Sequence, residues 1–452
     1  MSLRCAIVVP RYDGEAFEWQ EPLGAEAICG FLRKNGVECR VFDRRLCVNT
    51  EEISAYDPTA VGFSVMSEQN VPDALRVLQT LLKPGRRFFA GGLWVTQETI
   101  RAGALFPAGT LLISGEGENA ALAFVRSENP FSVPPLTPDE WAFASRDAMG
   151  EYISRGGVIQ LRSARGCGGH CAFCTHSGEQ KHPLQMRSLR LIADEMESLI
   201  EAGYPPVFNF TDDEFGDTER IGELCTLLRQ RRIRAAFSLE LRPQTVLKTA
   251  QKDWLALHEG GLCRIFTGLE SLNPDTLRCW NKPHNPEALL QAIRVCKSSG
   301  ILCETGYILF HARSTRQGIM EETARLRRED MFNPKTALSR MILYPGSHLH
   351  AERAARGTVF EPLAPNAEVL YLKWKKDLGE LFKAWGKLAL RLPGAACRDY
   401  LASGAAELPL LRAWLDRVNA LAYAKITGQE VTAEETELLL RKIQAVTGGI
   451  PS

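Results

Sequence analysis

Three cysteines, Cys167, Cys171 and Cys174, stand within eight residues of one another in a segment that also contains Gly168 and Gly169. Random placement of 13 cysteines in 452 residues would give only about 0.01 such triplets, so chance does not explain the spacing. Cysteine thiolates hold [4Fe–4S] clusters, and a short glycine-containing loop can bind three of the four irons while the fourth has no protein ligand. The triplet therefore predicts a cluster with one iron open to another molecule.

A zinc site is the alternative for the same residues. Zinc takes four nitrogen or sulfur ligands, and His170 or His176 could complete a set that begins with the three thiolates. The protein would then be a zinc-stabilised binding module rather than an enzyme.

The charge of the chain is balanced, with 54 basic and 54 acidic residues. No global field therefore favours nucleic acid or an acidic membrane, and we expect neither as a partner. No apolar run approaches the about 18 residues that span a bilayer, and the apolar stretch within residues 1–10 is too short for a signal peptide. The ten other cysteines are scattered, mostly inside apolar runs, as expected of buried reduced thiols. We expect a cytoplasmic protein.

The first 125 or so residues alternate short apolar runs with helical patterns, which predicts parallel strands joined by crossover helices. Strands are expected at Cys5–Val9, Glu38–Phe42, Ala60–Val65, Arg87–Ala90 and Leu111–Ile113, and helices at Leu23–Asn35 and Val71–Leu82. We therefore predict a doubly wound, Rossmann-like α/β domain over residues 1–128.

Small and polar residues follow the strands of this domain, among them Ser64, Gly91, Gly92 and Glu116. A doubly wound sheet binds its ligand outside the carboxyl ends of its strands. Glycine at these ends allows a bulky ligand to approach the backbone, although each glycine could instead serve only a tight turn.

A proline-rich stretch begins residues 129–154, which are typical of a linker. Six strand–helix units follow, fewer than the eight of a complete barrel, so residues 155–350 predict a partial (β/α)6 barrel of the TIM type. The strands are expected at Val158–Ser163, Val207–Thr211, Ala235–Leu241, Ile265–Leu269, Leu302–Phe310 and Ala337–Leu343, and the helices at Leu189–Ala202, Thr218–Arg231, Trp254–Glu259, Glu287–Ser299 and Arg316–Arg327. Residues 351–452 predict a helical region that we expect to cover the barrel mouth or to help select the substrate.

Chemistry-bearing residues collect where the predicted barrel strands end. The cysteine segment follows the first strand, and Asp213, Arg242, Glu270 and His311 follow the next four. The carboxyl ends of barrel strands meet at one rim, where barrel enzymes have their active sites. Each carboxylate could instead cap the helix after it, which stabilises a helix by about 0.5–2 kcal/mol.

The segment Cys167-x-x-x-Cys171-x-Phe173-Cys174 resembles the cluster-binding loop of the radical S-adenosylmethionine (SAM) superfamily. Further segments are similar to the family's later motifs, namely Val207–Glu214, Thr267–Ser271, Asn281-Lys282 and Leu343–Ser347. The resemblance covers residues 155–350. It implies that the three cysteines hold a [4Fe–4S] cluster, that the open iron binds SAM, and that one electron cleaves SAM to a 5′-deoxyadenosyl radical.

The same resemblance implies the residues that contact SAM. Phe173 would lie beside the adenine, and Asp213 or its neighbours, Arg242 and Glu270 are the other candidates. A flavodoxin- or ferredoxin-type protein would supply the electron. His311 stands where many relatives have a different turn, and it could be an acid or base near neutral pH or only a polar residue of the rim.

The small doubly wound domain ahead of this core is similar to that of the cobalamin-binding radical SAM enzymes. This resemblance implies that Ser64, Gly91, Gly92 and Glu116 lie near the nucleotide tail of cobalamin. All eight histidines lie at residue 170 or later, so the domain has no imidazole for cobalt, and it lacks the Asp-x-His-x-x-Gly pattern of other cobalamin proteins.

Together the two resemblances imply methylation of an unactivated carbon in a small-molecule or natural-product substrate. SAM would supply both the radical and, through cobalamin, the methyl group. A radical cyclisation, rearrangement or epimerisation, with or without cobalamin, is the alternative enzymatic function.

Overall fold

The chain forms two compact units, Met1–Gln160 and Leu161–Ser452. The computed structural model describes residues 3–11, 20–175, 183–358, 361–402 and 407–447. The two units are described in turn.

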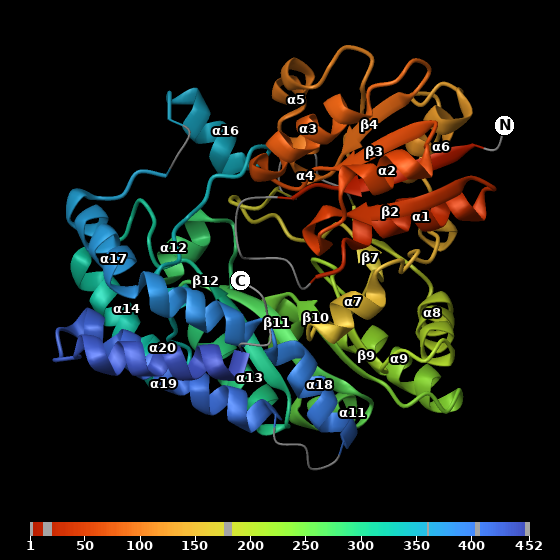
Figure 1. Cartoon of the computed structure of the whole chain (residues 1–452). Helices are drawn as coiled ribbons and strands as arrows, with labels where there is room; N and C mark the ends of the chain where they lie inside the picture. Colours follow the sequence, from red (N-terminus) through yellow and green to blue (C-terminus); the bar gives the residue numbers. More distant parts are fainter. Residues whose placement is uncertain (1–2, 12–19, 176–182, 359–360, 403–406, 448–452) are drawn as a thin grey trace. The chain divides into compact units, whose positions relative to one another are not determined.

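The first unit contains a five-stranded parallel sheet with helices between the strands (Figure 1). Its strands are β1 (Arg4–Val9), β2 (Glu38–Asp43), β3 (Ala60–Ser64), β4 (Arg87–Gly91) and β5 (Leu111–Leu112). Its α-helices are α1 (Leu23–Lys34), α2 (Thr50–Tyr56), α3 (Val71–Leu81), α4 (Leu93–Gln97), α5 (Thr99–Leu105), α6 (Glu118–Arg126) and α7 (Met149–Ser154), and its 3-10 helices are η1 (Arg44–Leu46), η2 (Glu68–Asn70) and η3 (Pro138–Glu140).

Alternate residues of β1 pack into two different cores. Cys5, Ile7 and Val9 pack with α1 and α6 on one face of the sheet, whereas Ala6 and Val8 pack with α2 and α3 on the other. A strand buried on both faces reads as a continuous apolar run, as β1 does. The strand order β2-β1-β3-β4-β5 is that of a doubly wound sheet, so the predicted fold class of this unit is confirmed.

Part of the segment predicted as a linker is packed within the first unit. Trp141 and Leu136 belong to the core formed by α1 and α6, and Tyr152 of α7 is buried and donates a hydrogen bond to Asp43 at the end of β2. The exact domain boundaries stay a prediction.

The second unit holds the rest of the strands and helices. Its strands are β6 (Ile159–Leu161), which begins at the unit boundary, β7 (Ala164–Arg165), β8 (Gln185–Met186), β9 (Val207–Phe210), β10 (Ala236–Leu241), β11 (Leu262–Glu270) and β12 (Leu302–Tyr307). Its helices are α8 (Leu189–Glu201), α9 (Thr218–Gln230), α10 (Pro243–Lys248), α11 (Gln251–Glu259), α12 (Pro274–Cys279), α13 (Pro286–Ser298), α14 (Arg316–Arg328), α15 (Pro334–Ala337), α16 (His348–Ala355), α17 (Pro365–Ala389), α18 (Leu392–Ala402), α19 (Glu407–Thr427) and α20 (Ala433–Thr447).

Five strands form the barrel sheet in the order β12-β11-β10-β9-β6. The sixth predicted strand, Ala337–Leu343, is reduced to one parallel bridge between Phe310 and Arg340. Its start is taken by α15, because Asn333 accepts a hydrogen bond from the backbone of Thr336 and so caps a short helix there. The structure therefore has the predicted partial barrel, with a weakly formed last edge.

The two faces of the barrel sheet differ in burial. Ile265, Thr267 and Leu269 of β11 are buried, whereas Arg264 and Phe266, which alternate with them, are half-buried. Amphipathic helices cover one face of such a sheet. The half-buried face therefore remains open to a ligand.

The C-terminal region is helical, as predicted, and Figure 1 shows α17 and α19 running side by side. Helix α18 lies against β9, β10 and β11. Tyr400 donates a hydrogen bond to the carbonyl of Glu259, and the backbone of Leu401 accepts one from Arg234. Glu259 and Arg234 come just before β11 and β10, so α18 lies at the amino ends of these strands. The barrel mouth is at the carboxyl ends, so for α18 the expectation that the C-terminal region covers the mouth is wrong.

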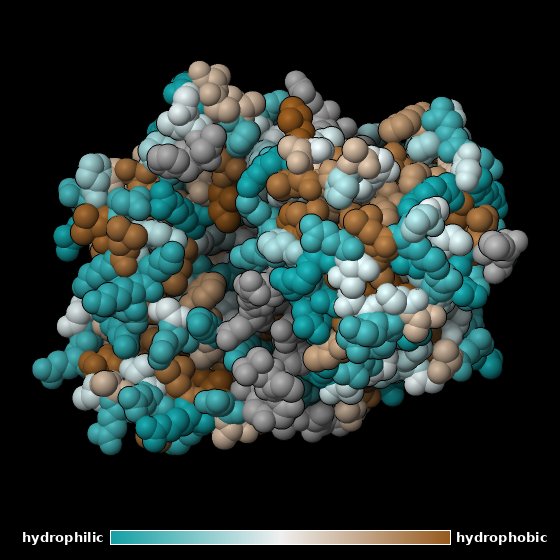
Figure 2. Space-filling model, turned by 45° about the horizontal axis from the view of Figure 1, so that its top comes forward, coloured by the Kyte–Doolittle hydropathy of each residue, from teal (hydrophilic) through white to brown (hydrophobic). Residues whose placement is uncertain are grey.

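In the part of the chain that the structure describes, no helix is both long and apolar enough to cross a membrane. Figure 2 shows a face on which hydrophilic residues are interspersed with small apolar patches.

Candidate functional site

A buried aspartate anchors the start of the cysteine segment. Asp212, just after β9, accepts hydrogen bonds from the backbone N–H groups of Ser163 and Ala164, both at 2.9 Å, and from the hydroxyl of Ser163. Burial raises the pKa of Asp212 to about 6, although these donors oppose the rise. The carboxylate therefore joins the end of the second barrel strand to the chain that leads from β6 into the cysteines.

The structure brings the sulfurs of Cys167 and Cys171 close to Gly169. A Cβ on Gly169 would lie 3.3 Å from Sγ of Cys167 and 4.0 Å from Sγ of Cys171. The backbone N–H of Cys174 donates to the carbonyl of Cys171 at 3.0 Å, which forms a turn between these two residues. All three cysteines are half-buried. Two of the predicted ligands thus face a common, partly accessible space, and the third follows in the same turn of the chain.

Glu214 is the acidic residue that contacts this loop. Its Oε2 accepts hydrogen bonds from the backbone N–H of Gly168 at 2.8 Å and from Sγ of Cys167 at 3.4 Å. Burial raises the pKa of the Cys167 thiol to about 11, and the carboxylate of Glu214 adds to the rise, against the backbone N–H of Gly169. A metal must therefore displace the proton of Cys167 when it binds there.

Arg242 lies over the two glycines of the loop. Its Nη1 is 3.5 Å from Oε1 of Glu214, and a Cβ on Gly168 would come within 2.9 Å of the same Nη1. Glycine at position 168 is thus what allows the guanidinium to lie so close to the cysteines. Asp213, the residue predicted beside Glu214, is exposed.

A second ion pair lies near Cys171 and Cys174. Nζ of Lys282 is 2.9 Å from Oε1 of Glu270, and only 11% and 13% of these side chains are exposed. Burial alone would lower the pKa of Lys282, but Glu270 and the sulfurs of Cys171 and Cys174 together raise it. The predicted residue Glu270 is therefore at the site together with a lysine.

Phe173 is half-buried and packs against another aromatic ring. Its ring lies edge-on to Trp280 with centroids 5.6 Å apart, and Trp280 is edge-on to His311 with centroids 4.9 Å apart. His311 is buried, and burial together with Arg313 lowers the pKa of its imidazole to about 4. The ring is therefore neutral near pH 7, where it would be a weak base.

Glu240 faces the open side of the sheet, one residue before Leu241 at the end of β10. It stands in register with Phe266 of β11, which is in register with Glu304 of β12. Burial raises the pKa of Glu240 to about 7, with Arg264 lowering it and Asp213 and Asp212 raising it. Glu240 therefore keeps its proton to a higher pH than an ordinary carboxyl group, a property that the sequence pattern did not reveal.

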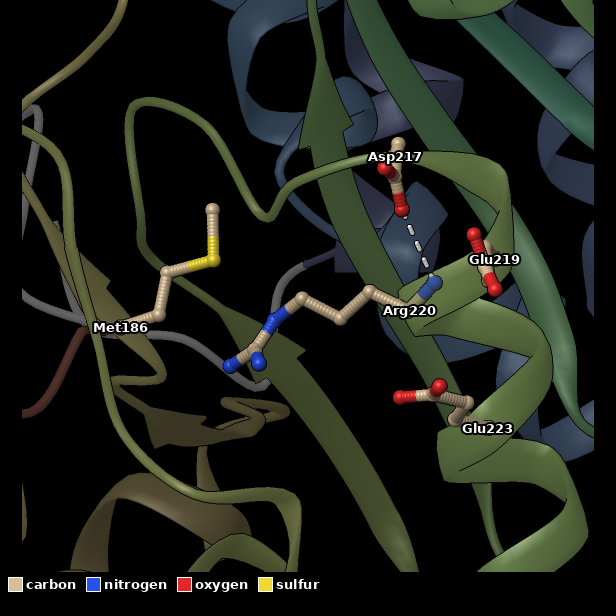
Figure 3. Close-up of a pocket in the computed structure, with 5 residues that line it drawn as sticks. All are labelled: Met186, Asp217, Glu219, Arg220 and Glu223. Atoms are coloured by element: carbon tan, nitrogen blue, oxygen red, sulfur yellow. Dashed lines mark hydrogen bonds between the residues drawn. The ribbon is translucent and has the colours of Figure 1, made fainter.

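A separate pocket of about 240 Å³ lies beside the start of α9 (Figure 3). Arg220 extends across it towards Met186, and its guanidinium donates to the carbonyls of Phe215 and Arg187. Three carboxylates, of Asp217, Glu219 and Glu223, line the pocket with these two residues. Because Arg220 holds the loop after β9 to the segment before α8, we assign the pocket a structural role.

In the first unit, Ser64, Gly91 and Gly92 meet at the carboxyl ends of β3 and β4. Ser64 and Gly91 are in register, and Gly92 has a φ of 105° with its Cα so close to Val65 that a Cβ would lie 2.6 Å from the Val65 carbonyl oxygen. Glu116 follows Gly115, whose N–H donates to the hydroxyl of Thr96 at 3.0 Å. The turn itself thus requires Gly92.

Two apolar side chains are exposed at the same edge of the sheet. Met66, just after β3, is 56% exposed, and Leu93, just after Gly92, is 45% exposed. Exposed apolar side chains at the ligand edge of a doubly wound sheet suit a large flat ligand with an apolar face. The residue types at this edge therefore fit a corrin.

The zinc alternative uses the same three cysteines together with His170 or His176. Among the described residues, no three His, Cys, Asp or Glu side chains form a group that could hold a metal ion, and this finding does not distinguish zinc from a cluster. His176, one of the two histidines considered for zinc, lies outside the described residues.

The comparisons with known proteins agree with this geometry. The model of the Radical SAM superfamily matches residues 161–318. The hopanoid C-2 methylase of Rhodopseudomonas palustris is 30% identical over 157 residues, 34% of this chain and 29% of that protein. The hopanoid C-3 methylase of Methylococcus capsulatus is 24% identical over 337 residues, 67% of this chain and 63% of that protein. The chain thus spans less than two thirds of the length of either relative.

The fold has a match among solved structures that covers nearly the whole chain. The cobalamin-dependent SAM radical enzyme OxsB, solved with aqua-cobalamin and SAM bound, superposes with a TM-score of 0.75. The alignment covers 99% of this chain and 75% of OxsB at 16% identity. The predicted radical SAM domain is confirmed for residues 161–318, and the fold predicted for the whole chain is confirmed by its likeness to OxsB.

Proposed function

Because this chain carries a radical SAM domain at residues 161–318 and has the fold of a cobalamin-dependent radical SAM enzyme, we propose that it methylates an unactivated carbon of a small-molecule substrate. The observation that carries the proposal is the convergence of Cys167 and Cys171 on Gly169, between the ion pairs Glu214–Arg242 and Glu270–Lys282. The methylase relatives support methyl transfer over cyclisation or rearrangement.

The three cysteines would hold a [4Fe–4S] cluster through their thiolates. When bound, the cluster supplies the electron that cleaves SAM to a 5′-deoxyadenosyl radical, and cobalamin carries the methyl group. The protein's own part is to place the ligands: Asp212 fixes the entry of the loop, and Glu214 holds the backbone at Gly168.

Charged groups beside the cysteines suit the two ends of SAM. Among the described residues, only Glu214 accepts a hydrogen bond from the side chain of Arg242, so its remaining N–H groups could bind the carboxylate of SAM. Glu270 could accept from the ammonium or the ribose hydroxyls of SAM, and Asp213 is exposed close by in the chain. Phe173 would lie beside the adenine while its ring stays in edge contact with the ring of Trp280.

In the first unit, Ser64, Gly91, Gly92 and Glu116 would lie along the nucleotide tail of cobalamin, and Met66 and Leu93 would be covered by the ligand. A flavodoxin- or ferredoxin-type protein would deliver the electron. The thirteen cysteines are all free thiols, which supports a reducing compartment, the cytoplasm, as the site of action.

Anaerobic reconstitution with iron, sulfide and hydroxocobalamin, followed by incubation with dithionite, a small-molecule extract of the source cells and SAM deuterated in its methyl group, tests the proposal. We expect corrin absorbance that persists through gel filtration, 5′-deoxyadenosine, and a product heavier by the labelled methyl group. Loss of the corrin on gel filtration would contradict the cobalamin part of the proposal. A product that gains no label while 5′-deoxyadenosine accumulates would favour cyclisation, rearrangement or epimerisation.

A further inference from the structure

Three consecutive residues after α12 are attached to the cysteine loop. The carbonyl of Trp280 accepts a hydrogen bond from the N–H of Ala172 at 2.8 Å. Nδ2 of Asn281 donates to the carbonyl of His170 at 2.9 Å. Nζ of Lys282 lies 5.8 Å from the centroid of the Phe173 ring. The segment Trp280–Lys282 therefore contacts loop residues that lie between the cysteines. It also places an ammonium group beside the loop.

The site is built to keep this ammonium in place. Glycines 268 and 306 are in register on β11 and β12, and a Cβ on Gly268 would lie 2.4 Å from Nζ of Lys282 and still closer to Oε1 of Glu270. A Cβ at position 268 would therefore displace the Glu270–Lys282 pair, and a Cβ at position 306 would press on it at 3.2 Å from Oε2 of Glu270.

Two residues in left-handed backbone conformations orient the pair. Glu270 has a φ of 62°, at a register shift between β11 and β12, and Asn281 has a φ of 50°. A left-handed conformation is unfavourable for most residues other than glycine, and for a glutamate more than for an asparagine, and such strain gathers at functional sites. A buried ion pair is also a poor stabilising device, because removing two charges from water offsets their attraction. The arrangement therefore serves something other than stability.

We propose that Lys282 is a positioning residue whose charge favours the reduced state of the cluster held by Cys167, Cys171 and Cys174. The proposal rests on the proposed function, because it needs a cluster bound at these cysteines. On reduction the cluster takes one electron, supplied in vitro by dithionite, and becomes more negative by one charge. A positive charge close by in a poorly solvated site stabilises the more negative state and so raises the reduction potential.

Glu270 makes the opposite contribution, because its carboxylate partly cancels the field of Lys282. The two residues therefore predict shifts of opposite sign. This is the feature that separates an electrostatic role from a merely structural one, since loss of packing would move both variants in the same direction.

The experiment is a potentiometric titration of the reconstituted full chain. The electron paramagnetic resonance signal of the reduced cluster is measured at each potential. At the wild-type midpoint we expect the ratio of reduced to oxidised cluster to fall about tenfold in Lys282→Met. Lys282→Arg should stay close to wild type, and Glu270→Gln should shift the ratio towards the reduced form. Lys252→Met removes the same charge from an exposed position on α11 and should leave the midpoint unchanged.

Iron and sulfide contents are measured first, so that the two claims can fail separately. A wild-type chain that binds neither overturns the proposed function and this inference with it. A loaded Lys282→Met with the wild-type midpoint overturns the inference alone. If Lys282→Met assembles no cluster, Glu270→Gln alone tests the direction of the shift. A midpoint potential of Glu270→Gln at or below the wild-type value then overturns the inference.

Discussion

Single residues at the cysteine loop show where the sequence was sufficient and where it was not. The spacing of the three cysteines predicted their meeting, because their separation along the chain is short. The acidic contact is Glu214 rather than Asp213. Strand β9 ends at Phe210, and beyond it the alternation of faces no longer applies, so the sequence could not say which of the following acidic side chains turns towards the cysteines.

Gly168→Ala should weaken SAM binding while leaving stability nearly unchanged. The added Cβ would come within 2.9 Å of Nη1 of Arg242, and a flexible guanidinium can move away at little cost. We expect an apparent SAM affinity about tenfold lower and a free energy of unfolding within about 0.5 kcal/mol of wild type. Equilibrium dialysis with labelled SAM measures the first and urea unfolding the second. Gly222→Ala, where a Cβ meets nothing within 4 Å, is the control, and equal SAM affinities in the two variants would contradict the prediction.

Glu240→Gln should stabilise the chain at pH 8 more than at pH 4.5. Burial raises the pKa of Glu240 in the fold to about 7 from an ordinary value of 4.5. A carboxyl with a raised folded pKa destabilises the fold increasingly as the pH rises from 4.5 to 7, and by a constant amount above 7. Removing the charge should therefore raise the free energy of unfolding by about 3 kcal/mol at pH 8 and by little at pH 4.5. Urea unfolding at both values, with the exposed Glu201→Gln as control, tests this, and a gain of the same size at both pH values would refute it.

At the scale of the elements, most strands and helices follow from apolar periodicity. Strands β1, β2, β3 and β4 lie within a residue of their expected bounds. Strands β1, β3 and β4 are mostly buried apolar runs, whereas β2, at the edge of the sheet, begins with alternating exposed and buried residues. The length of the last barrel strand is overpredicted by its apolar pattern, because capping by Asn333 favours a short helix at its start. The docking of Trp280–Lys282 on the cysteine loop joins residues over a hundred positions apart, and no local pattern contains that information.

The anchoring of β9 to the start of the cysteine segment gives a prediction at the same scale. Asp212→Ala removes the acceptor for two buried N–H groups, of Ser163 and Ala164. Each unsatisfied buried donor costs about 1–3 kcal/mol, so we expect a loss of about 3 kcal/mol in the free energy of unfolding and less bound iron after reconstitution. Urea unfolding and iron analysis measure these effects. The exposed neighbour variant Asp213→Ala should lose less than about 1 kcal/mol, and an equally large loss there would show that Asp212 is not the anchor.

At the scale of the whole molecule, the chain combines two units whose fold classes could be predicted separately. The doubly wound order β2-β1-β3-β4-β5 and the partial barrel both followed from the alternation of strands and helices. The choice of a SAM-cleaving cluster over zinc came from the resemblance of the cysteine segment, and the family match confirms a radical SAM domain at residues 161–318. The substrate is not encoded in any of these patterns, because they describe strands, helices and cofactor ligands and none of them identifies a substrate contact.

The central claim is that Cys167, Cys171 and Cys174 hold a cluster that cleaves SAM. The most direct measurement is the amount of 5′-deoxyadenosine formed per chain by the anaerobically reconstituted protein with SAM and dithionite. Wild type and the exposed-cysteine control Cys47→Ala should form it at similar rates, whereas Cys171→Ala should form none above background. Formation by Cys171→Ala at the rate of the control would contradict the account.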